Sequence, residues 1–174
     1  MYPESAWVDG PIANEPAGMA PGAEALIAAN INPTTGLATD YLNHFNEITM
    51  LLGLVADMPE VIEDLAAWQP ASYEAHFERS GFTGKALAID AYRSAPMEIR
   101  EALEVVVAEL DATLLDIIDA LRASPPYAHS AIVEKAEATI RPLMGRANGV
   151  IHGVGAEDLY GTNSGQAVAD FLMD

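Results

Sequence analysis

The chain has 174 residues, no cysteine, and 26 acidic against 8 basic residues, which gives a formal net charge of −18. The lack of cysteine excludes disulfides and thiolate metal ligands, and a negative field of this size opposes binding to nucleic acid or to an anionic membrane. No apolar run could span a bilayer and no secretory signal is visible, so we expect one cytoplasmic domain. The charge itself indicates either a solvated surface or attraction of a basic partner or a metal cation.

Residues 1–36 predict an extended N-terminal arm. Prolines and glycines recur throughout this stretch and prevent a long helix or a central strand, leaving only a short helical turn at about Ala23 to Ile31. Trp7 is a large apolar side chain, and we expect it to pack against another apolar surface rather than remain in solvent. The arm therefore either wraps across its own helices or docks onto another copy or another protein.

The next segment predicts one long helix followed by a leg of short ones. From about Thr39 to Asp57, apolar residues recur at steps of three and four, the spacing of one helical face. Prolines and a Ser-Gly-Phe-Thr-Gly stretch then interrupt the pattern. We expect three short helices here, at about 59–68, 73–79 and 85–93.

Two long helices complete the predicted core. Pro96 to Arg122 contains no glycine and has its proline at the first position, which a helix tolerates. Tyr127 to Val150 predicts the last helix, with a kink or restart at Pro142. The sequence thus predicts an all-α fold, an up-and-down bundle of about four helices over residues 37–153. Residues 154–174 form a C-terminal tail with a short helix at about 166–173.

Motifs of known chemistry are missing from the sequence. It contains no phosphate-binding glycine loop, HExxH, GxSxG or EF-hand loop. It also lacks Glu-x-x-His, the pair that ferritin-like di-iron bundles supply from two helices. No complete catalytic set is present, and we expect a protein that is not an enzyme.

One set of side chains could bind a ligand. Asp40, His44 and Glu47 follow at i, i+4 and i+7, which places them on one side of a helix. They could hold a divalent metal through imidazole and carboxylate groups, or tune His44 as a base. Alternatively, His44 is a core residue hydrogen-bonded to Asp40, with Glu47 in solvent.

Bundle topology extends this set. If the legs alternate in direction, Asn148 and His152 lie at the same end as His44, and Asp90 at the foot of the second leg also comes near. His152, however, projects about 120° away from the apolar stripe of its helix, which opposes its membership of the site.

Two hypotheses of function follow. The first is a non-enzymatic protein that acts through a protein partner or self-association, and the second is a small metal-dependent or ligand-binding protein that uses the His44 site. Val105 and Leu115 favour the first, because they lie on the side of the central helix opposite its main apolar stripe. We expect a homodimer whose interface includes Trp7, Val105 and Leu115.

Overall fold

The computed structural model describes residues 22–154, which form helices and turns without a strand; a single isolated bridge pairs Ile31 with Ala38. The predicted all-α class is confirmed for this part of the chain. The helical elements are α1 (Ala23–Ala28), the 3-10 turn η1 (Thr39–Leu42), α2 (Asn43–Leu54), η2 (Pro59–Val61), α3 (Ile62–Ala67), α4 (Tyr73–Arg79), α5 (Lys85–Ser94), α6 (Met97–Ala123), η3 (Pro126–Ala128) and α7 (His129–His152).

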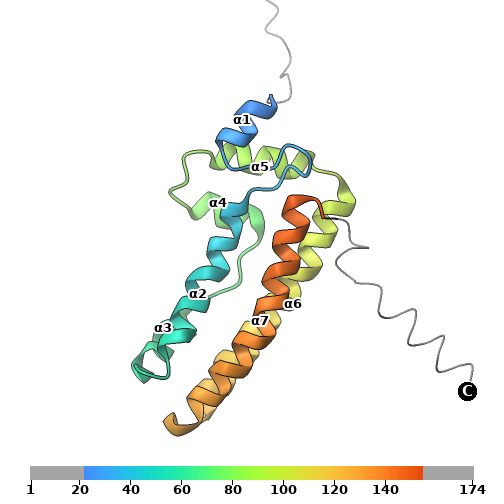
Figure 1. The fold of residues 1–174 in the computed structure, drawn as a ribbon. Coiled ribbons are helices and arrows are strands. Elements are labelled where there is room, and N and C mark those ends of the chain that lie inside the picture. Colours follow the sequence, from blue (N-terminus) through green and yellow to red (C-terminus); the bar gives the residue numbers. More distant parts are fainter. Residues whose placement is uncertain (1–21, 155–174) are drawn as a thin grey trace, which may run out of the picture.

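The two long helices, α6 and α7, form an antiparallel pair joined by a short turn (Figure 1). Pro96 directly precedes α6, and Pro125 and Pro126 follow its end, so proline chemistry sets both limits. The inward side of α6 supplies seven buried side chains to the core: Leu103, Val106, Val107, Leu110, Leu114, Ile118 and Leu121.

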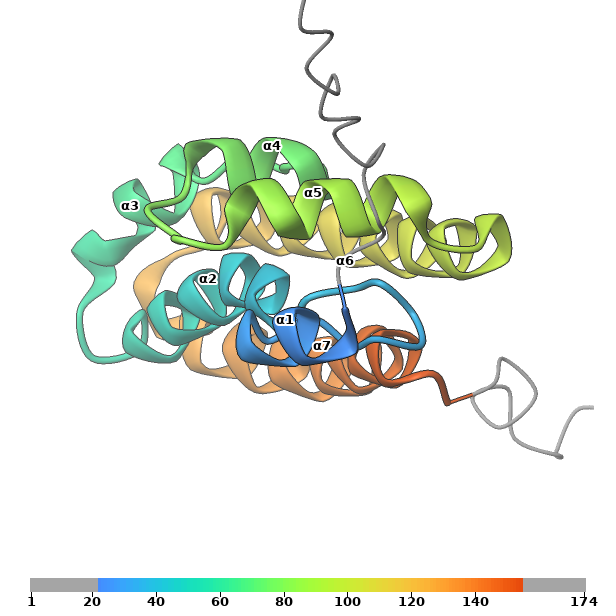
Figure 2. The same cartoon turned by 90° about the horizontal axis from the view of Figure 1, so that it is seen from above.

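The remaining helices cover this pair. Seen from above, α4 and α5 lie on the side of α6, whereas α1 and α2 lie on the side of α7 (Figure 2). The apolar face predicted for the first long helix is confirmed, since all five of its residues are buried: Tyr41, Phe45, Ile48, Leu52 and Val55. The three short helices expected after the first long one are present as α3, α4 and α5.

A tight turn between α1 and η1 ties the start of the described chain to its end. The Thr35 hydroxyl donates a hydrogen bond of 2.7 Å to the Ile151 carbonyl, and Thr35 and Ile31 are buried. Gly36 has φ +72°, and a Cβ there would lie 2.8 Å from the Ala91 carbonyl oxygen, so this turn requires glycine. Residues 22–36 of the predicted arm thus pack against the helices.

One local expectation differs from the structure. Helix α7 continues through Pro142 without a restart, because Pro142 and Ala138 are exposed and water can satisfy the carbonyl that the proline leaves unpaired. The three glycines at four-residue steps near the end of α7 lie in different surroundings. Gly145 is exposed, Gly149 is buried, and Gly153 ends the helix in the left-handed conformation with φ +75°.

Within residues 22–154, no helix combines the length and apolar character that crossing a membrane requires. Trp7 and the predicted helix at 166–173 lie outside the described residues.

Candidate ligand-binding site

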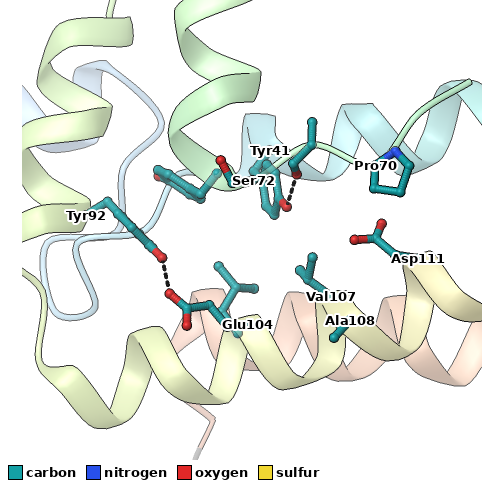
Figure 3. A pocket seen from close by; sticks show the side chains of 11 residues that line it. Tyr41, Pro70, Ser72, Tyr92, Glu104, Val107, Ala108 and Asp111 are labelled. Carbon is teal, nitrogen blue, oxygen red and sulfur yellow. Dashed lines mark hydrogen bonds between the residues drawn. The ribbon is translucent and has the colours of Figure 1, made fainter.

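A cavity of about 320 Å³ lies between α6 and the segments that cover it (Figure 3). This volume is near the lower end of the range for small-molecule sites. The lining residues come from η1, the α3–α4 connection, α4, α5 and α6. They are Tyr41, Pro70, Ala71, Ser72, Tyr73, Tyr92, Leu103, Glu104, Val107, Ala108 and Asp111.

Hydrogen bonds to the backbone fix two of the three tyrosine rings in this cavity. The Tyr41 hydroxyl donates to the Ala71 carbonyl at 2.8 Å, and the Tyr73 hydroxyl accepts from the Ala38 amide at 2.7 Å. Burial is the main cause that raises the pKa of both phenols, which therefore stay neutral at physiological pH. The cavity wall here consists of rigid, uncharged aromatic rings.

Tyr92 joins α5 to α6 at one end of the cavity. Its ring stacks on Tyr73 with centroids 4.4 Å apart, and its hydroxyl donates a 2.6 Å hydrogen bond to Glu104 Oε1. The Arg100 guanidinium carbon lies 5.9 Å from the Tyr92 ring centroid, within the distance of a cation–π contact. A tyrosine ring at this cavity thus already meets one cation.

Asp111 lies at the other end of the cavity, on the side of Tyr41 and Pro70 (Figure 3). Its Oδ1 atom is buried and has no hydrogen-bond partner among the described residues. Burial alone raises the pKa of the Asp111 carboxyl to about 6, and no neighbouring cation opposes that rise. A carboxylate that lacks a partner in an apolar cavity is costly unless a ligand satisfies it.

The arrangement suits a ligand that carries a positive charge. Two carboxylates, Glu104 and Asp111, stand one at each end of a cavity whose walls are aromatic and aliphatic. An ammonium or guanidinium group would pair with the carboxylate oxygen and face the negative side of a tyrosine ring. The apolar wall would hold the carbon chain attached to that group.

The six residues predicted from the sequence lie elsewhere. Glu47, Asp90, Asn148 and His152 are exposed and line none of the cavities described here. The Asp40 carboxylate accepts a 3.3 Å hydrogen bond from the Asn30 side chain.

His44 belongs to a different cluster from the predicted one. Its ring stacks on Trp68 with centroids 5.0 Å apart and lies 5.8 Å from the ring of His76. Burial, with contributions from His76 and Arg79, lowers the pKa of His44 to about 4. At physiological pH His44 is therefore a neutral aromatic ring that stacks on Trp68.

A metal ion would need more ligands than this cluster supplies. Nowhere in residues 22–154 do three histidine, aspartate or glutamate side chains gather closely enough to hold a metal ion. The structure brings His44 together with His76 and Trp68, and Asp40 contributes a backbone hydrogen bond and its charge to His76. Glu47 and His152 line neither this cluster nor the tyrosine cavity.

The residues of the tyrosine cavity were missed by the sequence analysis. Helical spacing alone does not bring together residues of η1, α4, α5 and α6, because they lie far apart in the sequence. One signal could have identified Asp111: buried apolar residues flank it at i−4 and i+3, Val107 and Leu114, which is the pattern of an inward position.

Comparison of the chain with protein-family models, curated proteins and solved structures found no match in any of the three.

Proposed function

We propose that this chain is a binding protein whose tyrosine cavity holds an organic cation, an ammonium or guanidinium group on a short apolar chain. One observation carries the proposal: Asp111 faces the cavity with a buried carboxylate oxygen that has no partner in residues 22–154. The formal net charge of −18 supports it, since the field of the whole chain attracts cations.

The energetic case rests on the low polarity of the cavity. A unit charge about 4 Å from Asp111 would gain roughly 4 kcal/mol at an effective dielectric constant near 20, before the cost of removing both groups from water. Contact with a tyrosine ring adds about 0.5–1 kcal/mol. These terms favour a weak, reversible complex for a ligand as small as the cavity allows.

Calorimetric titration with n-butylammonium tests the proposal. We expect binding to the wild-type chain and a loss of about tenfold or more in affinity for Asp111→Asn, which keeps the shape of the side chain and removes its charge. Asp116→Asn is the matched control, because it removes an exposed charge from the same helix. n-Butanol, with the same chain and no charge, should bind no variant.

Equal affinity of n-butylammonium for Asp111→Asn and wild type would reject the proposal. Equal affinity for n-butanol and n-butylammonium would show that the cavity binds the apolar chain and does not recognise the charge.

A second candidate function is association with a protein, through the face of α6 that carries Val105 and Leu115. These side chains are 55% and 40% exposed, so no described segment wraps them. The expected homodimer is one form of this function and a separate protein partner is the other. We also propose a cytoplasmic location. The antiparallel α6–α7 pair supports the proposal that about four helices are arranged up and down.

A further inference from the structure

The outer face of α6 carries an apolar stripe that no described residue covers. Met97, Val105 and Leu115 are 57%, 55% and 40% exposed, and Ala108 and Ala112 between them are exposed as well. At 100° per residue these five positions fall within an arc of about 80°, which also contains the exposed carboxylate of Glu101 between Met97 and Val105. A helix on the surface of a monomer normally has polar residues on such an arc. The alanines in the middle permit another backbone to approach closely.

Carboxylates border this stripe and dominate its charge. Helix α6 has only Arg100 and Arg122 as basic residues. In the described part of the chain, Arg122 pairs with Asp119 and Arg146 pairs with Glu109. The other acidic residues near the stripe have no ion-pair partner within residues 22–154: Glu98, Glu101, Glu104, Asp111 and Asp116.

A second copy of the chain suits this face poorly. An antiparallel pairing centred on Leu110 would place Val105 against Leu115 of the other copy. The same register would set Glu101 against Asp119 and Glu104 against Asp116, and like charges at such positions repel. A parallel pairing would set each carboxylate against its own counterpart. Two chains that each have a formal net charge of −18 would also repel each other at long range.

A helix of opposite charge suits the same face well. We propose that the stripe from Met97 to Leu115 docks an amphipathic helix of a basic partner, with small apolar residues at the contact and lysine or arginine along both flanks. At 1.5 Å per residue the stripe is about 27 Å long, which five turns of a partner helix would cover. Helix-in-groove recognition of this kind reads apolar anchors at i, i+3, i+4 and i+7.

The docking face and the tyrosine cavity are continuous. Ala108 lies within the stripe and also lines the cavity, and Glu104 and Asp111 stand at the border between the two (Figure 3). A lysine or arginine on the flank of the docked helix would extend its apolar stem across Ala108 and place its charge beside Asp111. This step rests on the proposed function, because it identifies the organic cation as a side chain of the partner.

A designed peptide tests the docking face. The probe is an acetylated, amidated helix of about 18 residues with leucine and alanine on one face and lysine on both flanks. Its matched control replaces every lysine with glutamate. We expect the lysine peptide to bind the full chain, the glutamate peptide not to bind, and the affinity to fall as salt screens the flanking charges.

Substitutions in the chain separate the face from the cavity. The double variant Val105→Thr, Leu115→Gln keeps the net charge. We expect it to lower the affinity for the lysine peptide about tenfold and to leave the affinity for n-butylammonium unchanged. Asp111→Asn should lower the affinity for both the lysine peptide and n-butylammonium. A peptide affinity that drops in the double variant but not in Asp111→Asn would support the face and reject the inserted cation.

Three results would overturn the proposal. The first is equal peptide affinity for the double variant and wild type, which would show attraction without a defined contact. The second is n-butylammonium binding without any peptide binding, which would leave the proposed function standing and remove the partner helix. The third is a dimer mass by light scattering that becomes a monomer mass in the double variant, which would show that a second copy covers the stripe.

Discussion

The Tyr92 hydroxyl donates a 2.6 Å hydrogen bond to Glu104 Oε1, and this bond joins α5 to α6 at the edge of the tyrosine cavity. Tyr92→Phe removes the donor and leaves the ring in place. Because the donor belongs to a buried tyrosine and the acceptor is a carboxylate, we expect a loss of about 1–2 kcal/mol in the free energy of unfolding, measured with urea. Tyr127→Phe is the control, since that side chain is 89% exposed and should show no change. Equal stability of both variants would mean that the bond contributes nothing.

Asp111 should weaken the fold at neutral pH. Its folded pKa of about 6 lies above the ordinary aspartate pKa of 3.8, so the folded state holds the proton more tightly. Its contribution to stability is therefore present below about pH 4 and is lost as the pH rises through 6. We expect Asp111→Asn to match wild type near pH 4 and to exceed it by about 1 kcal/mol at pH 7, the shift being discounted for partial exposure.

Asp116→Asn is the matched control for this pH series, because it removes an exposed charge from the same helix. If the two variants changed stability equally across the series, burial of Asp111 would not be the cause.

His44 should destabilise the fold in acid. Its folded pKa of about 4 lies below the ordinary histidine pKa of 6.5. Its contribution to stability is therefore complete above about pH 6.5 and is lost as the pH falls toward 4. His44→Phe keeps a ring against Trp68 and removes the titration. Between pH 6.5 and pH 4, we expect the free energy of unfolding to fall by about 1–2 kcal/mol less in this variant than in wild type, after discounting for partial exposure. An identical pH profile for His44→Phe would contradict this, and exposed His152→Phe provides the comparison.

Elemental analysis should find no stoichiometric metal in the purified chain. Asp40 interacts with His76, but no three histidine, aspartate or glutamate side chains in residues 22–154 gather closely enough to hold a metal ion, which leaves too few ligands for zinc, iron, manganese or nickel. A stoichiometric metal that is lost in His44→Ala would contradict this expectation and restore the metal site predicted from the sequence.

Salt should stabilise the folded chain. With 26 acidic residues against 8 basic ones, self-repulsion opposes the compact state, and added salt screens it. We expect the melting temperature to rise by a few degrees between low and moderate sodium chloride. A melting temperature independent of salt would show that the charge has no cost in stability.

Periodicity predicted the helices well because it reports which residues face inward. The stripe of α2 and the limits of α6 were correct to within a residue or two, since proline and apolar spacing are local properties of the sequence. The continuity of α7 through Pro142 was not predicted, because it depends on solvent access at that point.

The candidate site was harder to predict because it depends on contacts between distant segments. His44 meets Trp68 and His76 through the path of α3 and α4, and helix spacing says nothing about that path. The tyrosine cavity likewise combines residues separated by as many as seventy positions, from Tyr41 to Asp111. Only the exposure of Val105 and Leu115 followed directly from one helix, since a helical wheel shows which side opposes the core.

The most direct test of the account is the ionisation of the Asp111 carboxyl, followed by carbon-13 NMR with and without n-butylammonium. Without ligand, we expect the carboxyl to titrate with a pKa near 6, because burial opposes its charge. With saturating n-butylammonium, the pKa should fall by about one unit or more, since a bound cation favours the ionised form. An Asp111 pKa that is the same with and without the ligand would contradict the claim that this cavity holds a cation.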